Sequence, residues 1–173
     1  MKTLRYPFIL ITFLAATILT GCIPQVSREQ MIVPGITGTN KHTGTVLVSV
    51  SGVEKMSWVT PQNLQDAISD SLTLSGLFNH VVTVGDADYH LDVLMVKLDQ
   101  SNGIIIGTGT TGSARMMWTL TRQQDHKQVF QNEIVTEDKS YQFAGVTRVK
   151  AAMSGCIRKN IQEAIEQISK TEF

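Results

Sequence analysis

The C-terminal segment from Val146 to Ile168, VTRVKAAMSGCIRKNIQEAIEQI, has the most regular apolar pattern in the chain. Its apolar residues recur at spacings of three and four, the pattern of a helix with one buried face. The apolar stripe consists of Val146, Val149, Met153, Ile157, Ile161, Ala164, Ile165 and Ile168. We therefore expect a long amphipathic helix here, with Lys159–Glu163 and Glu166–Lys170 able to pair on its wet face.

A second helix is predicted after Thr60. Threonine is a good N-cap, Pro61 suits the first helical position, and Gly76 is a natural stop. The residues that share one face of this helix are Leu64, Ala67, Ile68 and Leu72.

Between and before these helices, short runs alternate apolar and polar residues, which predicts strands near 45–53, 81–84, 88–98, 114–121 and 129–136. Around 94–96 both faces become apolar, which indicates a bulge or coverage of both sides. The order strand, helix, strands, hairpin, helix predicts an α+β fold. We expect a mostly antiparallel sheet of four to five strands, with two helices packed on one face.

The chain starts with a secretory signal. Lys2 and Arg5 precede an apolar run from Phe8 to Leu19, which is too short to span a bilayer comfortably. The run ends in Leu19-Thr20-Gly21-Cys22, which resembles the lipobox of bacterial lipoproteins. This resemblance implies cleavage before Cys22, a diacylglyceryl thioether on its thiol and an acyl chain on its new amine. The residue after Cys22 is Ile23, not aspartate. In enterobacteria-like lipoproteins the absence of an aspartate at this position favours the outer membrane, so we expect the anchor in its inner leaflet, facing the periplasm.

The expected domain organisation is a signal peptide at 1–21, a lipidated cysteine with a flexible tether at 22–44, and a single α+β domain at 45–173. Pro24, Pro34, Gly35 and Gly38 indicate the tether, because they break any regular period. Removing 21 residues from the 173-residue chain leaves 152, which is enough for one ordinary core.

Charge and cysteine content exclude some classes of protein. The chain has 15 Lys and Arg and 15 Asp and Glu, and loss of Lys2 and Arg5 leaves the mature part near −2. A nucleic-acid partner is therefore not expected. Cys156 is the one thiol left once Cys22 is lipidated, so it cannot form an internal disulfide, and we interpret it as a small buried hydrophobe.

The candidate motifs for catalysis or cofactor binding lack the context or spacing that these functions require. Residues 107–112, GTGTTG, match the dinucleotide fingerprint G-x-G-x-x-G, but the segment after them reads as a strand instead of the required helix. The histidines His42, His80, His90 and His126 show no metal-ligand spacing. We expect no catalytic residues, no metal, no cofactor beyond the covalent lipid, and no small-molecule substrate.

Ile104, Ile105 and Ile106 lie between Gly103 and Gly107 and form a possible partner-binding loop. Three consecutive isoleucines in an exposed loop are a liability unless something covers them. One alternative is a glycine-rich connection whose isoleucines extend a strand and bury against a helix. The other is an apolar hairpin tip that contacts a partner or lipid.

A family resemblance follows from Leu74-Ser75-Gly76-Leu77-Phe78, Val81-Val82 and Ala87-Asp88-Tyr89-His90-Leu91. These segments resemble small Gram-negative envelope lipoproteins: the amino-terminal domain of the Tol translocation protein, the curli-secretion lipoprotein and the lipoprotein activators of penicillin-binding proteins. The pattern Trp118, Val129-Phe130, Gly145, Arg148 and Asn160-Ile161 also resembles auxiliary lipoproteins of lipid transporters.

The resemblance implies an α+β domain that binds other envelope proteins and does no chemistry. We expect a non-catalytic lipoprotein, held on the membrane by its lipid, that acts as an adaptor or activator of an unidentified envelope protein. The alternative is a structural accessory of a lipid or lipopolysaccharide transport machine.

Replacing Cys22 with serine should abolish lipidation, because a serine hydroxyl cannot replace the thiolate nucleophile. Metabolic labelling with radioactive palmitate should mark the parent chain and leave the Cys22→Ser chain unlabelled. Label on the substituted chain would contradict the lipobox interpretation.

Overall fold

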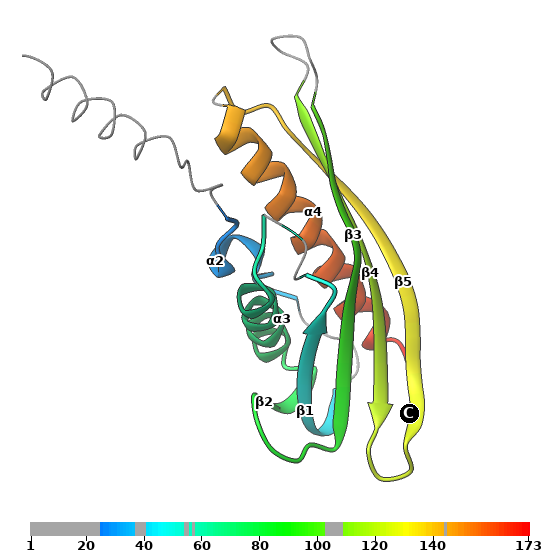
Figure 1. The fold of residues 1–173 in the computed structure, drawn as a ribbon. Helices are drawn as coiled ribbons and strands as arrows, with labels where there is room; N and C mark the ends of the chain where they lie inside the picture. Colours follow the sequence, from blue (N-terminus) through cyan, green and yellow to red (C-terminus); the bar gives the residue numbers. More distant parts are fainter. Residues whose placement is uncertain (1–24, 37–40, 54–55, 57, 103–108, 144) are drawn as a thin grey trace, which may run out of the picture.

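A computed structural model describes residues 25–36, 41–53, 56, 58–102, 109–143 and 145–173 (Figure 1). Its helices and strands follow one another along the chain as α2 (Arg28–Met31), β1 (His42–Ser51), α3 (Pro61–Ser75), β2 (Phe78–Val82), β3 (Tyr89–Asn102), β4 (Thr110–Arg122), β5 (Lys127–Ser140) and α4 (Gly145–Ile168).

The five strands form one mixed sheet in the order β2-β1-β3-β4-β5. β1 pairs in parallel with β2 and β3, whereas β3–β4 and β4–β5 are antiparallel. The parallel β1–β2 pair arises because α3 is the crossover between them, and a crossover returns the chain in its original direction. The expected α+β fold is confirmed, with the antiparallel pairings confined to the three longest strands.

The expected second helix is confirmed as α3. The Thr60 hydroxyl accepts a hydrogen bond from the Asn63 backbone N–H at 3.1 Å. Gly76 ends the helix in the left-handed conformation, at φ 62°, which glycine adopts without steric cost. All four residues of the expected apolar face are buried.

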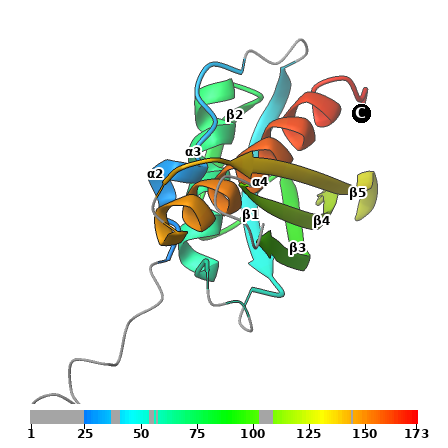
Figure 2. The same cartoon turned by 90° about the horizontal axis from the view of Figure 1, so that it is seen from above.

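Both long helices cover the same face of the sheet (Figure 2). α3 packs over β1 and β2, and α4 packs over β4 and β5. The strands contribute alternate residues to this interface, including Val48, Leu91, Met116, Trp118 and Ile134, each at most 2% exposed. Because successive strand residues point to opposite faces, the residues between them lie on the face without helices.

Asn160 fastens α4 to the sheet through its fully buried amide. Its Oδ1 accepts a hydrogen bond from Trp118 Nε1 at 2.8 Å. Its Nδ2 lies 2.8 Å from the Ile134 carbonyl oxygen, 3.2 Å from Thr136 Oγ1 and 3.4 Å from the Ala114 carbonyl oxygen. One side chain on α4 therefore contacts both β4 and β5.

Two glycines let α4 approach the sheet closely. A Cβ at Gly112 would lie 2.6 Å from the Ala152 carbonyl oxygen, too close for a real contact. A Cβ at Gly155 would meet the Asp138 carboxylate. Gly112, the last glycine of the fingerprint match at 107–112, thus has a packing role. Gly112 lies within β4, so a strand stands where nucleotide binding would require a helix.

The helix α4 differs from the expected long helix in the burial of one apolar residue and in its ion pairs. Val146 is 55% exposed, because the first turn of α4 extends past the level at which Gly112 meets Ala152. Lys159 Nζ bonds to Asp138 Oδ1 at 2.6 Å, and Glu166 accepts from Gln162, so neither uses the expected i,i+4 partner. The remaining stripe residues are buried as expected.

Cys156 lies in the core of the α4–sheet interface with no exposed surface. Burial raises the pKa of its thiol to about 12, since desolvation disfavours the thiolate. This agrees with its interpretation as a small hydrophobe.

Asn160→Ala should lower the free energy of unfolding by roughly 2–3 kcal/mol, since it leaves the buried Trp118 N–H without its acceptor. Gln162→Ala, on the exposed face of the same helix, is the control and should cost under about 0.5 kcal/mol. Denaturant melts of the two variants measure the difference, and equal losses would show that the Asn160 amide contributes nothing specific.

The Cys156 thiol should not react with Ellman's reagent at pH 8 in the folded protein, because the nucleophilic thiolate is scarce and shielded. It should react fully once denaturant unfolds the chain. Rapid reaction of the native protein would contradict its burial.

Candidate functional site

The residues predicted for lipidation and partner binding lie outside the described residues. These are Leu19, Thr20, Gly21 and Cys22 of the lipobox, and Ile104, Ile105 and Ile106 between β3 and β4. The structure describes the chain from Gln25 onward, and it describes Asn102 and Thr110, which pair at the end of the β3–β4 ladder.

Part of the expected flexible tether packs on the domain. Val26 and Met31 are fully buried and Val33 is 4% exposed, within the core that α3 and α4 share. This corrects the boundary at 45, because residues 26–33 belong to the folded domain and β1 begins at His42. The apolar residues in this segment are too few to show a period, so only tertiary packing reveals their burial.

Hydrogen bonds fix this segment against α3. The Val26 backbone N–H donates to the Trp58 carbonyl oxygen at 2.7 Å, and Val33 N–H donates to Ser71 Oγ at 3.1 Å. Arg28 in α2 pairs with Asp70 in α3. The chain that enters the domain from its N-terminal side is therefore held from Val26 onward.

The sheet face without helices carries an apolar patch, here called the open-face patch, which consists of Leu94, Val96, Met117 and Val135. Leu94 is 45% exposed, Val96 44% and Val135 51%, while Met117 is half-buried between them. Leu94 lies opposite Met117 in the β3–β4 register. The bulge expected near 94–96 is confirmed between Met95 and Lys97. It leaves Val96 on this face, turns Lys97 to the same face, and returns Leu98 to the side of the core.

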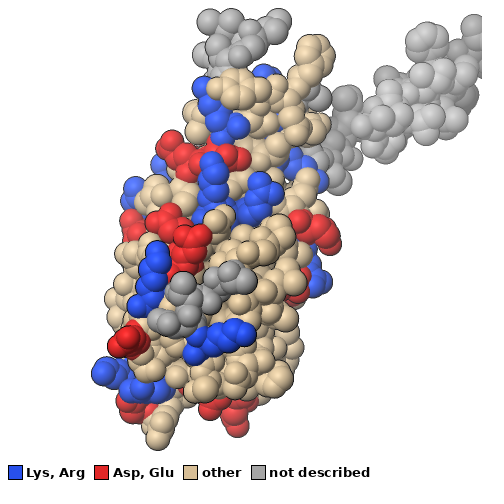
Figure 3. Space-filling model, turned by 180° about the vertical axis from the view of Figure 1, so that it is seen from behind, with Lys and Arg blue, Asp and Glu red and all other residues tan. Residues whose placement is uncertain are grey.

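Charged residues of both signs border the open-face patch. Arg115 lies opposite Val135 and approaches Glu133 at 3.7 Å, and Lys97 pairs with Asp99. Figure 3 likewise shows acidic and basic side chains interspersed over the face of the molecule that it presents. Protein interfaces often combine an apolar centre with a polar border. The sequence alone does not reveal this patch, because its residues come together only through the strand register.

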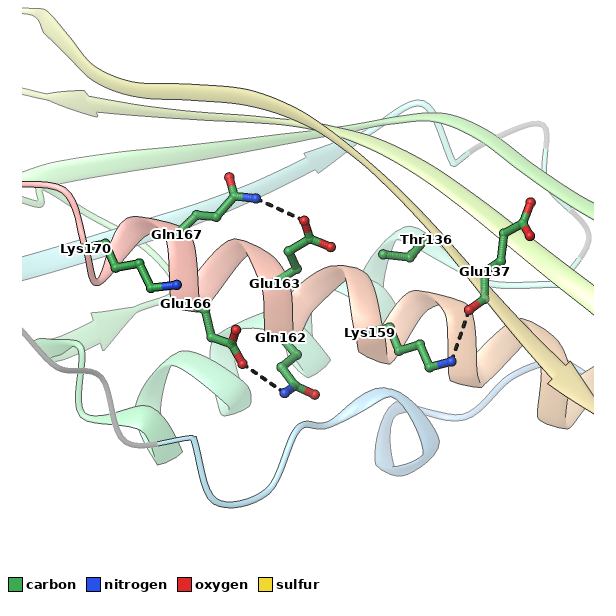
Figure 4. Close-up of a pocket in the computed structure, with 8 residues that line it drawn as sticks. All are labelled: Thr136, Glu137, Lys159, Gln162, Glu163, Glu166, Gln167 and Lys170. Carbon is green, nitrogen blue, oxygen red and sulfur yellow. Dashed lines mark hydrogen bonds between the residues drawn. The ribbon is translucent and has the colours of Figure 1, made fainter.

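A groove of about 500 Å³ between α4 and β5 is polar and satisfied by its own side chains. Gln162 donates to Glu166 at 2.9 Å, Gln167 donates to Glu163 at 3.1 Å, and Lys159 donates to the Glu137 carbonyl oxygen at 3.1 Å (Figure 4). Most of the polar side chains of this groove therefore pair with one another, and the groove is shallow and polar instead of an apolar ligand pocket.

Within the part of the chain that the structure describes, no three His, Cys, Asp or Glu residues gather into a possible metal site. His42 is buried, stacks on the Phe173 ring at 3.9 Å and lies 3.2 Å from the Ile168 carbonyl oxygen. Burial lowers the pKa of His42 despite that hydrogen bond. The ring therefore has a structural role, in closing the C-terminus over the sheet.

The helices among the described residues include none that is long and apolar enough to cross a membrane.

No protein-family model matches the sequence, and no curated protein matches it either. Solved structures do match the fold. Protein XCC0632 from Xanthomonas campestris, of the family DUF330, superposes with a TM-score of 0.63 at 14% identity, covering 80% of this chain and 94% of that one. The hypothetical protein CT253 from Chlamydia trachomatis gives 0.56 at 9% identity, covering 75% and 98%.

A looser likeness is to a minor lipoprotein from Acinetobacter baumannii, with a TM-score of 0.46 at 16% identity, covering 73% of this chain and 90% of that one. At such identities the first two likenesses show a shared fold, which extends over nearly the whole of those chains. The resemblance to the Tol, curli-secretion and activator lipoproteins stays a prediction. The fold of this chain is thus similar to that of XCC0632.

Proposed function

We propose that the protein is a lipid-anchored protein of the bacterial outer membrane that acts without catalysis, by holding another envelope protein on the open-face patch. The lipobox at 19–22 supports the anchor. The observation that carries the proposal is the exposed apolar centre of the sheet, with charges of both signs at its border.

The geometry of this face suits a macromolecule more than a small ligand. A 14-residue strand such as β3 is roughly 45 Å long at about 3.3 Å per residue, so the face has the extent of a standard protein interface. Small-molecule sites are concave and enclose most of their ligand, whereas this face is a sheet surface. An adaptor or activator needs such a surface and no catalytic group.

The interface would depend on Leu94 and Val135, because exposed apolar side chains at the centre of a patch contribute most when a partner excludes water from them. The border charges would fix orientation and partner choice, since exposed ion pairs such as Arg115–Glu133 contribute little to affinity. Stability of the domain should not depend on any of these residues, as they lie outside the core.

A photo-crosslinking residue at Val135 tests the proposal in intact cell envelopes, with the same residue at Gln162 on the exposed face of α4 as the matched control. Position 135 should give discrete protein adducts, and position 162 should give few. A second chain carries the photo-crosslinking residue at position 94. Adding Val135→Glu to that chain should remove its adducts, while its melting temperature should stay within a few degrees of that of the parent chain.

Equal labelling from positions 135 and 162 would contradict the proposal. The identity of an adduct separates the two versions of this function. A soluble or peptidoglycan-associated partner fits an adaptor, and a barrel or transporter fits a structural accessory of lipid transport.

A further inference from the structure

Three large apolar side chains lie in solvent at one end of the domain, where β5 ends and α4 begins. Phe143 is 99% exposed, Tyr141 66% and Val146 55%. We call these residues the apical patch. They lie within six residues of sequence, at the end of β5 and the start of α4, and each is exposed.

The start of β4 lies beside this patch. A Cβ at Gly109 would be 3.0 Å from the Tyr141 ring and 3.1 Å from the Lys139 side chain. Gly109 has φ 65°, a conformation that glycine adopts freely. The apical patch therefore forms the end of the sheet opposite the turn at 123–126 between β4 and β5.

The residues that flank the apical patch in sequence are basic. From Lys139 to Lys150 the sequence has three Lys and Arg residues and no Asp or Glu, and Asp138, just before them, pairs with Lys159. Lys139 Nζ lies 5.1 Å above the centre of the Tyr141 ring. Arg148 Nε is buried and has no hydrogen-bond partner among the described residues. Lys139 therefore lies directly beside the apical patch, and Arg148 and Lys150 follow it within the first two turns of α4.

The N-terminal segment places the predicted lipid near the same end. Figures 1 and 2 both show α2 beside the N-terminal half of α4, and the two helices are in contact. Val26 is fixed by its hydrogen bond to Trp58. Four residue steps from Cys22 to Val26 span at most about 14 Å. An acyl chain on Cys22 would therefore keep this half of the domain close to the bilayer.

We propose that the apical patch inserts among the headgroups of a lipid surface that contains anionic lipids, with Lys139, Arg148 and Lys150 binding their phosphates. This proposal rests on the proposed lipid anchor. Aromatic side chains favour the membrane interface, where an apolar ring and a polar edge are both satisfied. Lys and Arg beside them attract anionic headgroups.

The other end of the domain carries charges of both signs. Asp86, Asp88 and Asp125 lie at the connections β2–β3 and β4–β5, but Arg122 pairs with Asp125 and Lys127 begins β5 beside it. The proposed orientation therefore rests on the apical patch and the cations near it. The open-face patch differs in having a border of both charges, which suits a protein.

The test uses the full lipidated chain in vesicles of phosphatidylethanolamine and phosphatidylglycerol. Phe143→Cys carries an environment-sensitive fluorophore, and Val84→Cys, 86% exposed near Asp86, is the matched control. Cys156 is buried and does not compete for the label. The label at 143 should be quenched several-fold more by lipids with a nitroxide near the headgroup than the label at 84. Equal quenching at the two positions would overturn the proposal.

Arg148→Glu combined with Lys150→Glu should reduce quenching at 143 several-fold in vesicles with phosphatidylglycerol and leave it unchanged in phosphatidylcholine vesicles. Undiminished quenching with phosphatidylglycerol would overturn the role of the cations.

Flotation of the chain with the vesicles reports the anchor separately. A chain that floats without quenching at 143 refutes the apical patch and leaves the anchor standing. A chain that neither floats nor shows quenching counts against both.

Discussion

The buried amide of Asn160 is the interaction on which the arrangement of this domain depends. It accepts from the Trp118 indole and donates to oxygens of β4 and β5, so it fixes the rotation of α4 and its height over two strands together. An apolar residue in its place would leave the indole N–H buried without a partner, which costs more than a lost surface hydrogen bond. The close approaches at Gly112 and Gly155 allow this amide to reach the sheet.

Fixing α4 on one face decides what the other surfaces can do. Because both long helices cover the same face, the long strands expose alternate residues on the other, and these include the open-face patch. Because α4 is buried only from Val149 onward, Val146 in its first turn stays exposed. Both candidate contact surfaces therefore follow from the position of one helix.

Local signals in the sequence predicted the elements whose determinants are local. Thr60, Pro61 and Gly76 define α3 within one residue, and the period of 146–168 defines α4. The parallel pairing of β1 with β3 could not be predicted in this way, because a strand has the same alternation whichever neighbour it pairs with. The burial of Val26 and Met31 was missed for a similar reason, since it depends on α3 and α4 being side by side.

The proposed lipid site and contact surfaces differ in the same way. The lipobox is a continuous motif, so Cys22 could be predicted from four adjacent residues. The open-face patch joins residues from three strands, and only the register brings Leu94, Met117 and Val135 together. The apical patch is continuous in sequence, but Val146 fits the helical period, so its exposure appears only when the end of the sheet is known.

The packed N-terminal segment gives these surfaces a common geometry. A tether of 20 free residues would let the domain tumble on the order of 25 Å from the membrane and would separate the anchor from any docking surface. With Val26 held by Trp58, about 14 Å of chain remains to Cys22. If Cys22 carries the proposed lipid, the anchor stays within about 14 Å of Val26. A partner on the open-face patch would then be held within a narrower range of heights above the bilayer than a 20-residue flexible tether would allow.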